Sequence, residues 1–304
     1  MSAVAAAGAV CRRLDGERWH FQHGPIDCIV AAAGDPAAVG AAIERAEARL
    51  RTLLEELVAE LPLLRADLSA RPIPPTPRGP VARRMVAACR PHGDDGRFIT
   101  AMAAVAGSVA EELLAAFDDP RIVRASVNNG GDIALRLLGG ERYDVGVCAD
   151  PVRGRYGAPL DGRFAVHAAS PVRGIATSGW RGRSFSLGIA DSVTVLAATA
   201  SVADAAATIV ANAVDIDDAR IVRVPANALR DDSDLGERLV TRAVAPLPDA
   251  LVATALGRGA VEARAQIAAG RIVAAVLSLQ GRWSVVGALA AAPRTARIEE
   301  ESPC

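Results

Sequence analysis

The chain has 304 residues, of which 51% are hydrophobic and 23% charged, so it can bury a large core and is not compositionally disordered. Its formal net charge of −1 gives no general attraction to nucleic acid or to anionic membranes, and we expect neither as a partner. All 34 basic residues are arginines, which excludes a Schiff-base lysine, a P-loop lysine and a lysine general base.

Targeting signals and cysteine usage bear on the compartment. Residues 1–10 are small and apolar but lack the basic start of a signal peptide, and no apolar run reaches the roughly 18 residues of a membrane span. The five cysteines form no C-x-x-C pair and have no zinc-site spacing with the histidines. We therefore expect a cytoplasmic protein with reduced cysteines. They are Cys11, Cys28, Cys89, Cys148 and Cys304.

The N-terminal part begins with a strand pair and continues with helices. Residues 19–30 alternate in polarity around Gly24-Pro25, which predicts two strands and a turn. Apolar residues at helical spacing predict a long amphipathic helix over residues 36–60. The proline-rich run RPIPPTPRGP, residues 71–80, predicts a long loop inside one domain.

Two further helices are expected before the chain turns to strands. Residues 81–89 predict a short helix, and residues 98–117 a longer one built of small side chains. Gly107 lies inside this second helix, where glycine costs about 1 kcal/mol relative to alanine. A glycine at such a position indicates that another part of the molecule packs close to its backbone.

From residue 121 onward the pattern is mainly that of strands. Strands are predicted over residues 121–127, 133–138, 143–148, 165–169, 174–177, 184–189, 192–198, 272–279 and 282–287. Helices are predicted over residues 201–214, with Ser201 as N-cap, and 249–269, and a frayed tail over residues 291–304. This mixture lacks βαβ regularity, so we expect a single α+β domain over residues 1–304, with mixed sheets packed against helices.

Three groups of residues could bind a ligand. Asp204 and Thr208 lie four residues apart on a predicted helix and so share a face, where their oxygens suit Mg²⁺ or Ca²⁺. An aspartate near a helix N-terminus can instead simply favour the helix dipole. The turn Asn129, Gly130, Gly131 and Asp132 lets a phosphate approach the backbone, or is only a tight hairpin turn.

The third group follows a predicted strand. Hydroxyl and guanidinium groups on a glycine-containing turn suit phosphate or carboxylate recognition, although a solvated loop explains them equally well. Its members are Thr177, Ser178, Gly179, Arg181, Arg183 and Ser184.

Four runs in this order resemble the ApbE-like superfamily, and most closely its uncharacterised cytosolic branch. They are MAAVAGSVAEELL (102–114), VNNGGDIAL (127–135), YDVGVCADP (143–151) and IATSGWRGRSFSLGIADSVTVLAATASVADAAAT (175–208). The similarity extends over roughly residues 26–286. It implies an α+β fold with a flavin nucleotide, FAD or FMN, in a cleft beside the central sheet.

The resemblance also implies roles for individual residues. Mg²⁺ would be bound by Asp204, Thr208 and the backbone carbonyl of Ala106, and the turn from Asn129 to Asp132 would lie near the cofactor. In the transferases of the superfamily, FMN is moved from FAD to a threonine of an acceptor protein through a phosphoester. An acceptor protein would then be a partner here, besides the nucleotide and a homodimer formed through the alanine-rich helix face.

This sequence departs from the transferase pattern at two places. Transferases carry a lysine near the position of Gly107 and a His-Ile-Ile-Asp-Pro-like stretch where this chain reads GRSFSLGIAD. Arg183 stands where the uncharacterised branch often has a histidine, and an arginine is a poor general base. Flavin binding is thus expected ahead of transfer, and no catalytic residue is assigned.

Two other functions remain open. One is an enzyme of sulfide assimilation into homocysteine, or of one-carbon metabolism, on the same scaffold, which a redox-active Cys89 or Cys148 would favour. The other is a non-catalytic scaffold that binds a partner protein through its helices.

Overall fold

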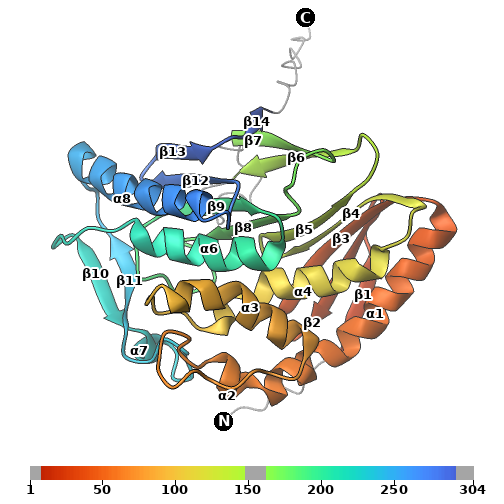
Figure 1. Ribbon diagram of the computed structural model, residues 1–304, viewed down its shortest axis with the longest axis horizontal. Helices are drawn as coiled ribbons and strands as arrows, with labels where there is room; N and C mark the ends of the chain where they lie inside the picture. The colour runs from red at the N-terminus through yellow and green to blue at the C-terminus, as the bar shows by residue number, and fades with distance from the viewer. Residues whose placement is uncertain (1–7, 148–161, 292–304) are drawn as a thin grey trace, which may run out of the picture.

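The computed structural model describes residues 8–147 and 162–291, and it shows a layer of helices against a long sheet (Figure 1). The sheet has nine strands in the order β1-β2-β3-β4-β5-β8-β9-β12-β13. These strands are β1 (Val10–Arg13), β2 (Arg18–His23), β3 (Ile26–Gly34), β4 (Ile122–Asn129), β5 (Asp132–Leu137), β8 (Gly174–Ser178), β9 (Ser192–Ala197), β12 (Ala274–Leu279) and β13 (Arg282–Gly287).

Helices and two smaller sheets complete the described part of the chain. The helices are α1 (Pro36–Ala59), α2 (Leu61–Leu64), α3 (Pro80–Asp94), α4 (Val105–Leu114), α6 (Ala200–Ala213), α7 (Ala226–Leu229) and α8 (Asp249–Ala268). One small sheet has the order β14-β7-β6, from β6 (Arg142–Val147), β7 (Gly162–His167) and β14 (Ala290–Ala291); the other pairs β10 (Ile221–Pro225) with β11 (Leu239–Val244). Every strand pair among the described residues is antiparallel, as an α+β protein allows.

The central strands are buried on both faces, because successive side chains of a strand point to opposite sides. Ile175 of β8 and Leu196 of β9 pack with Phe164 of the small three-stranded sheet. Their neighbours Ala176 and Val195 pack instead into the core beneath α6 and α8. This explains why β9 and β12 are buried at every position and why their sequences do not alternate.

The α1 helix shows how the sequence defines the helical layer. Asp35 caps it by accepting a hydrogen bond of 2.9 Å from the backbone N–H of Ala38, and Pro36 occupies its first turn. The stripe from Val39 to Leu57 faces the core, with Leu50 and Leu53 fully buried. The capping residue, the proline and the periodic apolar face can each be recognised within this stretch of sequence. For this reason the predicted helix, residues 36–60, agrees with α1 to within one residue.

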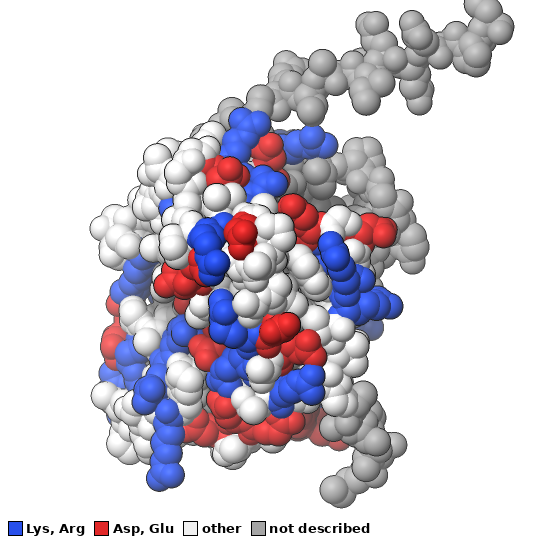
Figure 2. Space-filling model, turned by 90° about the vertical axis from the view of Figure 1, so that its right-hand side faces the viewer, with Lys and Arg blue, Asp and Glu red and all other residues white. Residues whose placement is uncertain are grey.

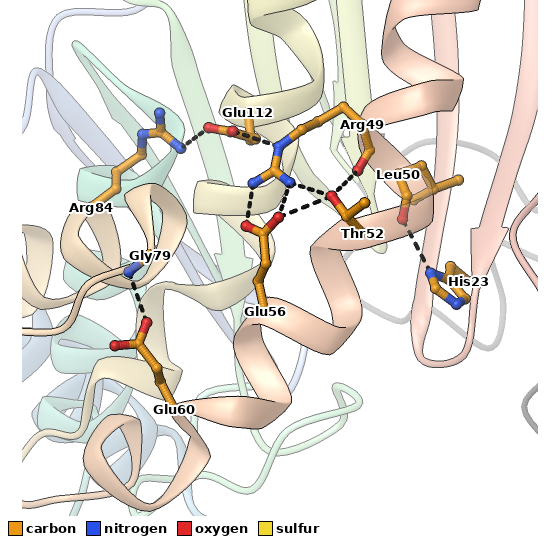
Figure 3. Close-up of polar contacts among 9 residues, drawn as sticks. All are labelled: His23, Arg49, Leu50, Thr52, Glu56, Glu60, Gly79, Arg84 and Glu112. Carbon is orange, nitrogen blue, oxygen red and sulfur yellow. Dashed lines mark hydrogen bonds and ion pairs between the residues drawn. The ribbon is translucent and has the colours of Figure 1, made fainter.

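Figure 3 shows the polar contacts that join α1, α3 and α4. Arg49 binds Glu56 on its own helix and, through Nε, Glu112 of α4 at 2.8 Å. Glu112 also accepts a bond of 3.0 Å from Arg84 of α3. Glu60 accepts a hydrogen bond of 2.8 Å from the backbone N–H of Gly79, the residue directly before α3. Because these ion pairs are partly shielded from water, they fix the three helices more firmly than exposed pairs would.

Most of the predicted elements are confirmed. The first hairpin, the 36–60 helix, the loop after residue 71, the hairpin at Asn129–Asp132 and the final hairpin around Gln280 are all present. The strand β1 and the β10–β11 pair were not predicted. The predicted tail at residues 291–304 lies almost wholly outside the described residues.

Three predictions are wrong in ways that have a physical reason. Residues 184–189 do not form a strand, because their backbone groups bond to other elements: Ile189 N–H donates to the carbonyl of Val214 at 2.8 Å. The cap of α6 is Thr199, which accepts from Val202 N–H, and not Ser201. The predicted 98–117 helix is divided into a 3₁₀ turn, α4 and a second 3₁₀ turn.

The surface carries charges of both signs. On the face in Figure 2, arginine and acidic side chains are interspersed, and no large area of one sign is seen. A polyanion would therefore meet no continuous positive surface on this face. Among residues 8–147 and 162–291, no helix has both the length and the apolar character needed to cross a membrane.

Candidate functional site

The candidate site lies where α4 and α6 begin, between the helical layer and the sheet. Gly107 in the first turn of α4 makes this arrangement possible, since a Cβ atom there would lie 2.3 Å from the carbonyl oxygen of Ala200. No side chain fits at that distance, so the close approach expected from a glycine inside this helix is confirmed. Asp204 is thereby brought beside the start of α4.

Asp204 does for α4 what a local cap does for most helices. Ala104 precedes α4 and provides no side-chain cap. The Asp204 carboxylate instead accepts a hydrogen bond of 2.9 Å from Gly107 N–H, and the N–H of Ala106 also interacts with it. A carboxylate is favourable at a helix N-terminus, where backbone N–H groups lack partners and the dipole is positive.

Asn129, at the end of β4, fixes the Ala106 carbonyl beside this carboxylate. Its side-chain N–H donates to that carbonyl at 3.2 Å, and its side-chain oxygen accepts from Asp27 N–H at 3.4 Å. Asn129 is only 8% exposed, so its side-chain amide serves to hold the neighbouring backbone in place. Its position explains why the turn after β4 reaches the start of α4.

Asp132 supplies the second carboxylate, from the start of β5. Its Oδ1 accepts a hydrogen bond of 3.0 Å from Thr177 N–H on β8. The turn before it contains Gly130 and Gly131, both with positive φ, and Gly131 N–H donates to the Asn128 side chain at 2.8 Å. The hairpin turn and the Thr177 strand end are therefore joined at this carboxylate.

Ionisation is unfavourable for both carboxylates. Burial raises the pKa of Asp132 to about 7, against the opposing effect of the Thr177 N–H. Burial, and then the charge of Asp132, raise the pKa of Asp204 well above its usual range, although the N–H groups of Gly107 and Ala106 act in the other direction. Without a cation, such a pair favours retaining a proton; with a divalent cation, both groups can ionise.

Arg183 and Arg181 have different surroundings. A guanidinium nitrogen of Arg183 lies 3.4 Å from where a Cβ atom of Gly130 would be, so it stands directly over the hairpin turn. Arg181 instead binds the Asp191 carboxylate at 2.8 Å and stacks on Trp180. Arg183 thus lies beside the hairpin turn, and Arg181 stabilises the loop that carries it.

The rest of the Thr-Ser-Gly group is only partly at the site. Thr177 is exposed and shares a hydrogen bond of 2.9 Å with the hydroxyl of Thr194. Gly179 is explained by packing, because a Cβ atom there would lie 2.5 Å from the Asp191 carbonyl oxygen. Ser178 ends β8 and is partly exposed between them.

Thr208 follows Asp204 by one turn of α6 and, like it, is half-buried. Ala106 and Asp132 are also half-buried, so each of the four residues keeps some exposed surface. Their donors are two carboxylates, a hydroxyl and a carbonyl, the hard oxygens that Mg²⁺ prefers. Across the described residues no cluster of three or more histidine, cysteine or acidic side chains could hold a metal, so a cation here would depend partly on neutral oxygens.

Two surface hollows lie elsewhere. One, of about 450 Å³, is bounded by Arg13, Trp19 and Ile43, and the other, of about 580 Å³, by Arg84, Arg136 and Arg173. Neither includes Asp132 or Asp204. Among the described residues, the candidate site is where two carboxylates with raised pKa values, Asp132 and Asp204, occur together with the approach of Arg183.

Replacement of Asp132 by asparagine tests whether the pKa of this carboxyl is raised, through its effect on the free energy of unfolding. The pKa of Asp132 is higher in the folded protein than in the unfolded chain. Its contribution to the free energy of unfolding is therefore fully present below about pH 4, where the carboxyl is protonated in both states, and is lost as the pH rises through about 7. In the presence of a chelator at pH 8, we expect the free energy of unfolding of D132N to be about 2 kcal/mol higher than that of the wild type. One pKa unit corresponds to about 1.4 kcal/mol, and water reduces the effect because this group is partly exposed.

Urea denaturation at pH 4.5 and pH 8 measures this difference. Comparing the two proteins at each pH cancels the opposite trend of His92, whose pKa burial lowers to about 4. A difference that is equal at both pH values would show that the Asp132 pKa is not raised.

The fold and the site together define an α+β protein with a candidate cation and nucleotide site. The family model described as AbpE bacteria matches residues 11–285, and the chain therefore belongs to that family. This confirms the resemblance to the ApbE-like superfamily that four sequence runs indicated.

Similar proteins were found among archaeal sequences. The UPF0280 protein of Methanopyrus kandleri is 37% identical over 171 residues, covering 55% of this chain and 63% of that protein. The UPF0280 protein of Methanothrix thermoacetophila is 33% identical over 170 residues, covering 55% of this chain and 66% of that protein. The chain thus spans less than two thirds of the length of each.

Among solved structures, the flavin transferase ApbE of Vibrio cholerae is similar over 93% of this chain and 96% of its own. A mutant form superposes with a TM-score of 0.37 at 13% identity, and a second structure with 0.34 at 15% identity.

Proposed function

We propose that this protein binds a flavin nucleotide, FAD or FMN, together with Mg²⁺ at the start of α4 and α6. The observation that carries the proposal is the meeting of Asp132 and Asp204, from distant parts of the chain, with pKa values that burial raises. An uncompensated carboxylate pair is costly inside a protein, and a bound cation removes that cost. Membership of the family supports a flavin nucleotide as the other ligand.

The proposed roles of the residues follow from their positions. Asp204, Thr208 and the carbonyl of Ala106 would hold Mg²⁺, which would neutralise charge on the nucleotide phosphates. The turn Asn129, Gly130, Gly131 and Asp132 would approach the nucleotide through its backbone. Arg183 stands over that turn, where its guanidinium can pair with a phosphate.

For a transfer step, we propose Asp132 as the proton acceptor. Its side chain is a carboxylate, which is able to act as a general base. It could therefore receive the proton of an acceptor hydroxyl in a chain that contains no lysine. We further propose an acceptor protein as a partner, a homodimer and a cytoplasmic location.

The structure gives no support to the sulfur-enzyme alternative through Cys89. Cys89 is fully buried, and burial raises the pKa of its thiol well above its usual range, with the charge of Asp204 adding to the effect. A buried protonated thiol is a poor nucleophile. Cys148 lies outside the described residues, while Cys11, Cys28 and Cys89 are free thiols.

The test is a titration of the purified protein with FAD and with FMN, followed by flavin fluorescence, in Mg²⁺ and in EDTA. We expect binding that is at least 10-fold tighter in Mg²⁺. Absence of binding in both conditions would refute the proposal and favour the partner-binding scaffold. Titration with riboflavin, which lacks phosphate, is the matched control and should show no effect of Mg²⁺.

A further inference from the structure

Glu111, one turn beyond Gly107 on α4, makes a contact that its own helix does not require. Its Oε1 accepts a hydrogen bond of 2.6 Å from the backbone N–H of Ser201, in the first turn of α6. Its Oε2 lies 3.2 Å from Nε of Arg84 on α3. The carboxylate is held between a helix N-terminus and a guanidinium group, and its side chain is 20% exposed.

Glu111 adds a second cap at the start of α6, beside the one that Thr199 provides. The hydroxyl of Thr199, the local cap, accepts from Val202 N–H at a long 3.4 Å and shares a hydrogen bond of 3.3 Å with the hydroxyl of Ser201. Ser201 N–H has no carbonyl within its own helix to bind, because the first N–H groups of an α-helix have no intrahelical partner. A carboxylate from another helix satisfies it and is favoured there by the helix dipole.

The two helices thus cap each other. Asp204 of α6 binds Gly107 N–H at the start of α4, and Glu111 of α4 binds Ser201 N–H at the start of α6. The two hydrogen bonds connect the helices into a closed ring. Gly107 and Glu111 lie one turn apart on α4, and Ser201 and Asp204 lie just under one turn apart on α6. The orientation of Asp204 is therefore linked to the bond that Glu111 makes.

We propose that Glu111 is a positioning residue for the cation and nucleotide site, holding Asp204 opposite the Ala106 carbonyl. This inference rests on the proposed function. Arg84 keeps the Glu111 carboxylate directed at Ser201 by binding its second oxygen. Loss of the Glu111 bond frees the start of α6 to move, and Asp204 moves with it.

The first experiment compares three variants in the FAD titration with Mg²⁺. Glu111→Ala is expected to weaken binding at least 10-fold. Glu111→Gln should stay within about threefold of the wild type, because its side-chain oxygen can still accept from Ser201 N–H. Glu112→Ala is the matched control: Glu112 binds Arg49 and Arg84 but makes no bond to α6, so this variant loses stability while keeping its affinity. Equal affinity losses in Glu111→Ala and Glu112→Ala would overturn the proposal.

The second experiment needs no ligand and separates this inference from the proposed function. Amide hydrogen exchange is measured by NMR for Gly107 and Ser201 in the wild type and the same variants. Glu111→Ala should accelerate exchange at Gly107 as well as at Ser201 by at least 10-fold, and Glu112→Ala should leave the two amides equally protected. An unchanged Gly107 amide in Glu111→Ala would refute the positioning role. Accelerated exchange in a protein that binds no flavin would refute only the proposed function.

Discussion

An Asp204→Asn variant is expected to lose at least 100-fold of its Mg²⁺-dependent affinity for FAD. The carboxamide can still accept hydrogen bonds from Gly107 and Ala106, so the start of α4 stays capped. It carries no charge, however, and a neutral amide oxygen is a weak ligand for a hard divalent cation. In EDTA the variant should unfold no more easily than the wild type, because it removes a carboxylate whose pKa burial raises.

Calorimetric titration with FAD in Mg²⁺ measures this effect. Asp215→Asn is a suitable control, since Asp215 follows the other end of α6 and binds Arg223. Burial raises the pKa of Asp215 as well, but it lies outside the site, so its variant should bind as the wild type does. Undiminished affinity in Asp204→Asn would remove Asp204 from the cation site.

Replacement of Gly107 by alanine is expected to destabilise the protein by about 3 kcal/mol, as overpacking of a tight core does. The added Cβ would lie 2.3 Å from the Ala200 carbonyl oxygen and 2.5 Å from its carbon. Both atoms belong to the backbone of α6, so no side-chain rotation can relieve the contact. Since α6 must shift, Asp204 should also leave its place and flavin binding should fall.

Urea denaturation measures the stability change, and Gly257→Ala provides its control. Gly257 lies inside α8 with no atom within 4 Å of the position of a Cβ. Alanine there should stabilise the protein by up to about 1 kcal/mol through its higher helix propensity. If Gly107→Ala were as stable as Gly257→Ala, then α4 and α6 would not be in close contact.

The sequence predicted those parts of the site that are local. Asp204 and Thr208 share a helix face by spacing alone, and the Asn129–Asp132 turn follows from two glycines between strands. The nearness of Asp132 to Asp204 could not be predicted from composition or spacing, because it depends on how β5 and α6 are placed in three dimensions. Only the family resemblance joined them beforehand.

The errors have a similar origin. Residues 184–189 alternate as a strand does, yet their N–H and carbonyl groups bond to the end of α6 and to β11. Ser201 and Thr199 are both good capping residues, but Thr199 has the extended backbone of an N-cap (φ −141°, ψ 157°), while Ser201 already lies in the first turn of α6. The sequence likewise gives no reason to separate Arg181 from Arg183, since Asp191 lies eight to ten residues further on.

The number of paired residues differs between neighbouring strands of the long sheet, and this affects where the sheet separates on unfolding. Between β3 and β4 there are seven residue pairs, with one register shift before the last, whereas between β5 and β8 there are only two. The site spans this short joint: Ala106 and Asp132 come from one side of it, and Thr177 and Asp204 from the other. A cation bound there would connect the two parts of the sheet at the strand pair with the fewest paired residues. We therefore expect that, with the cation bound, the parts on either side of this strand pair unfold together.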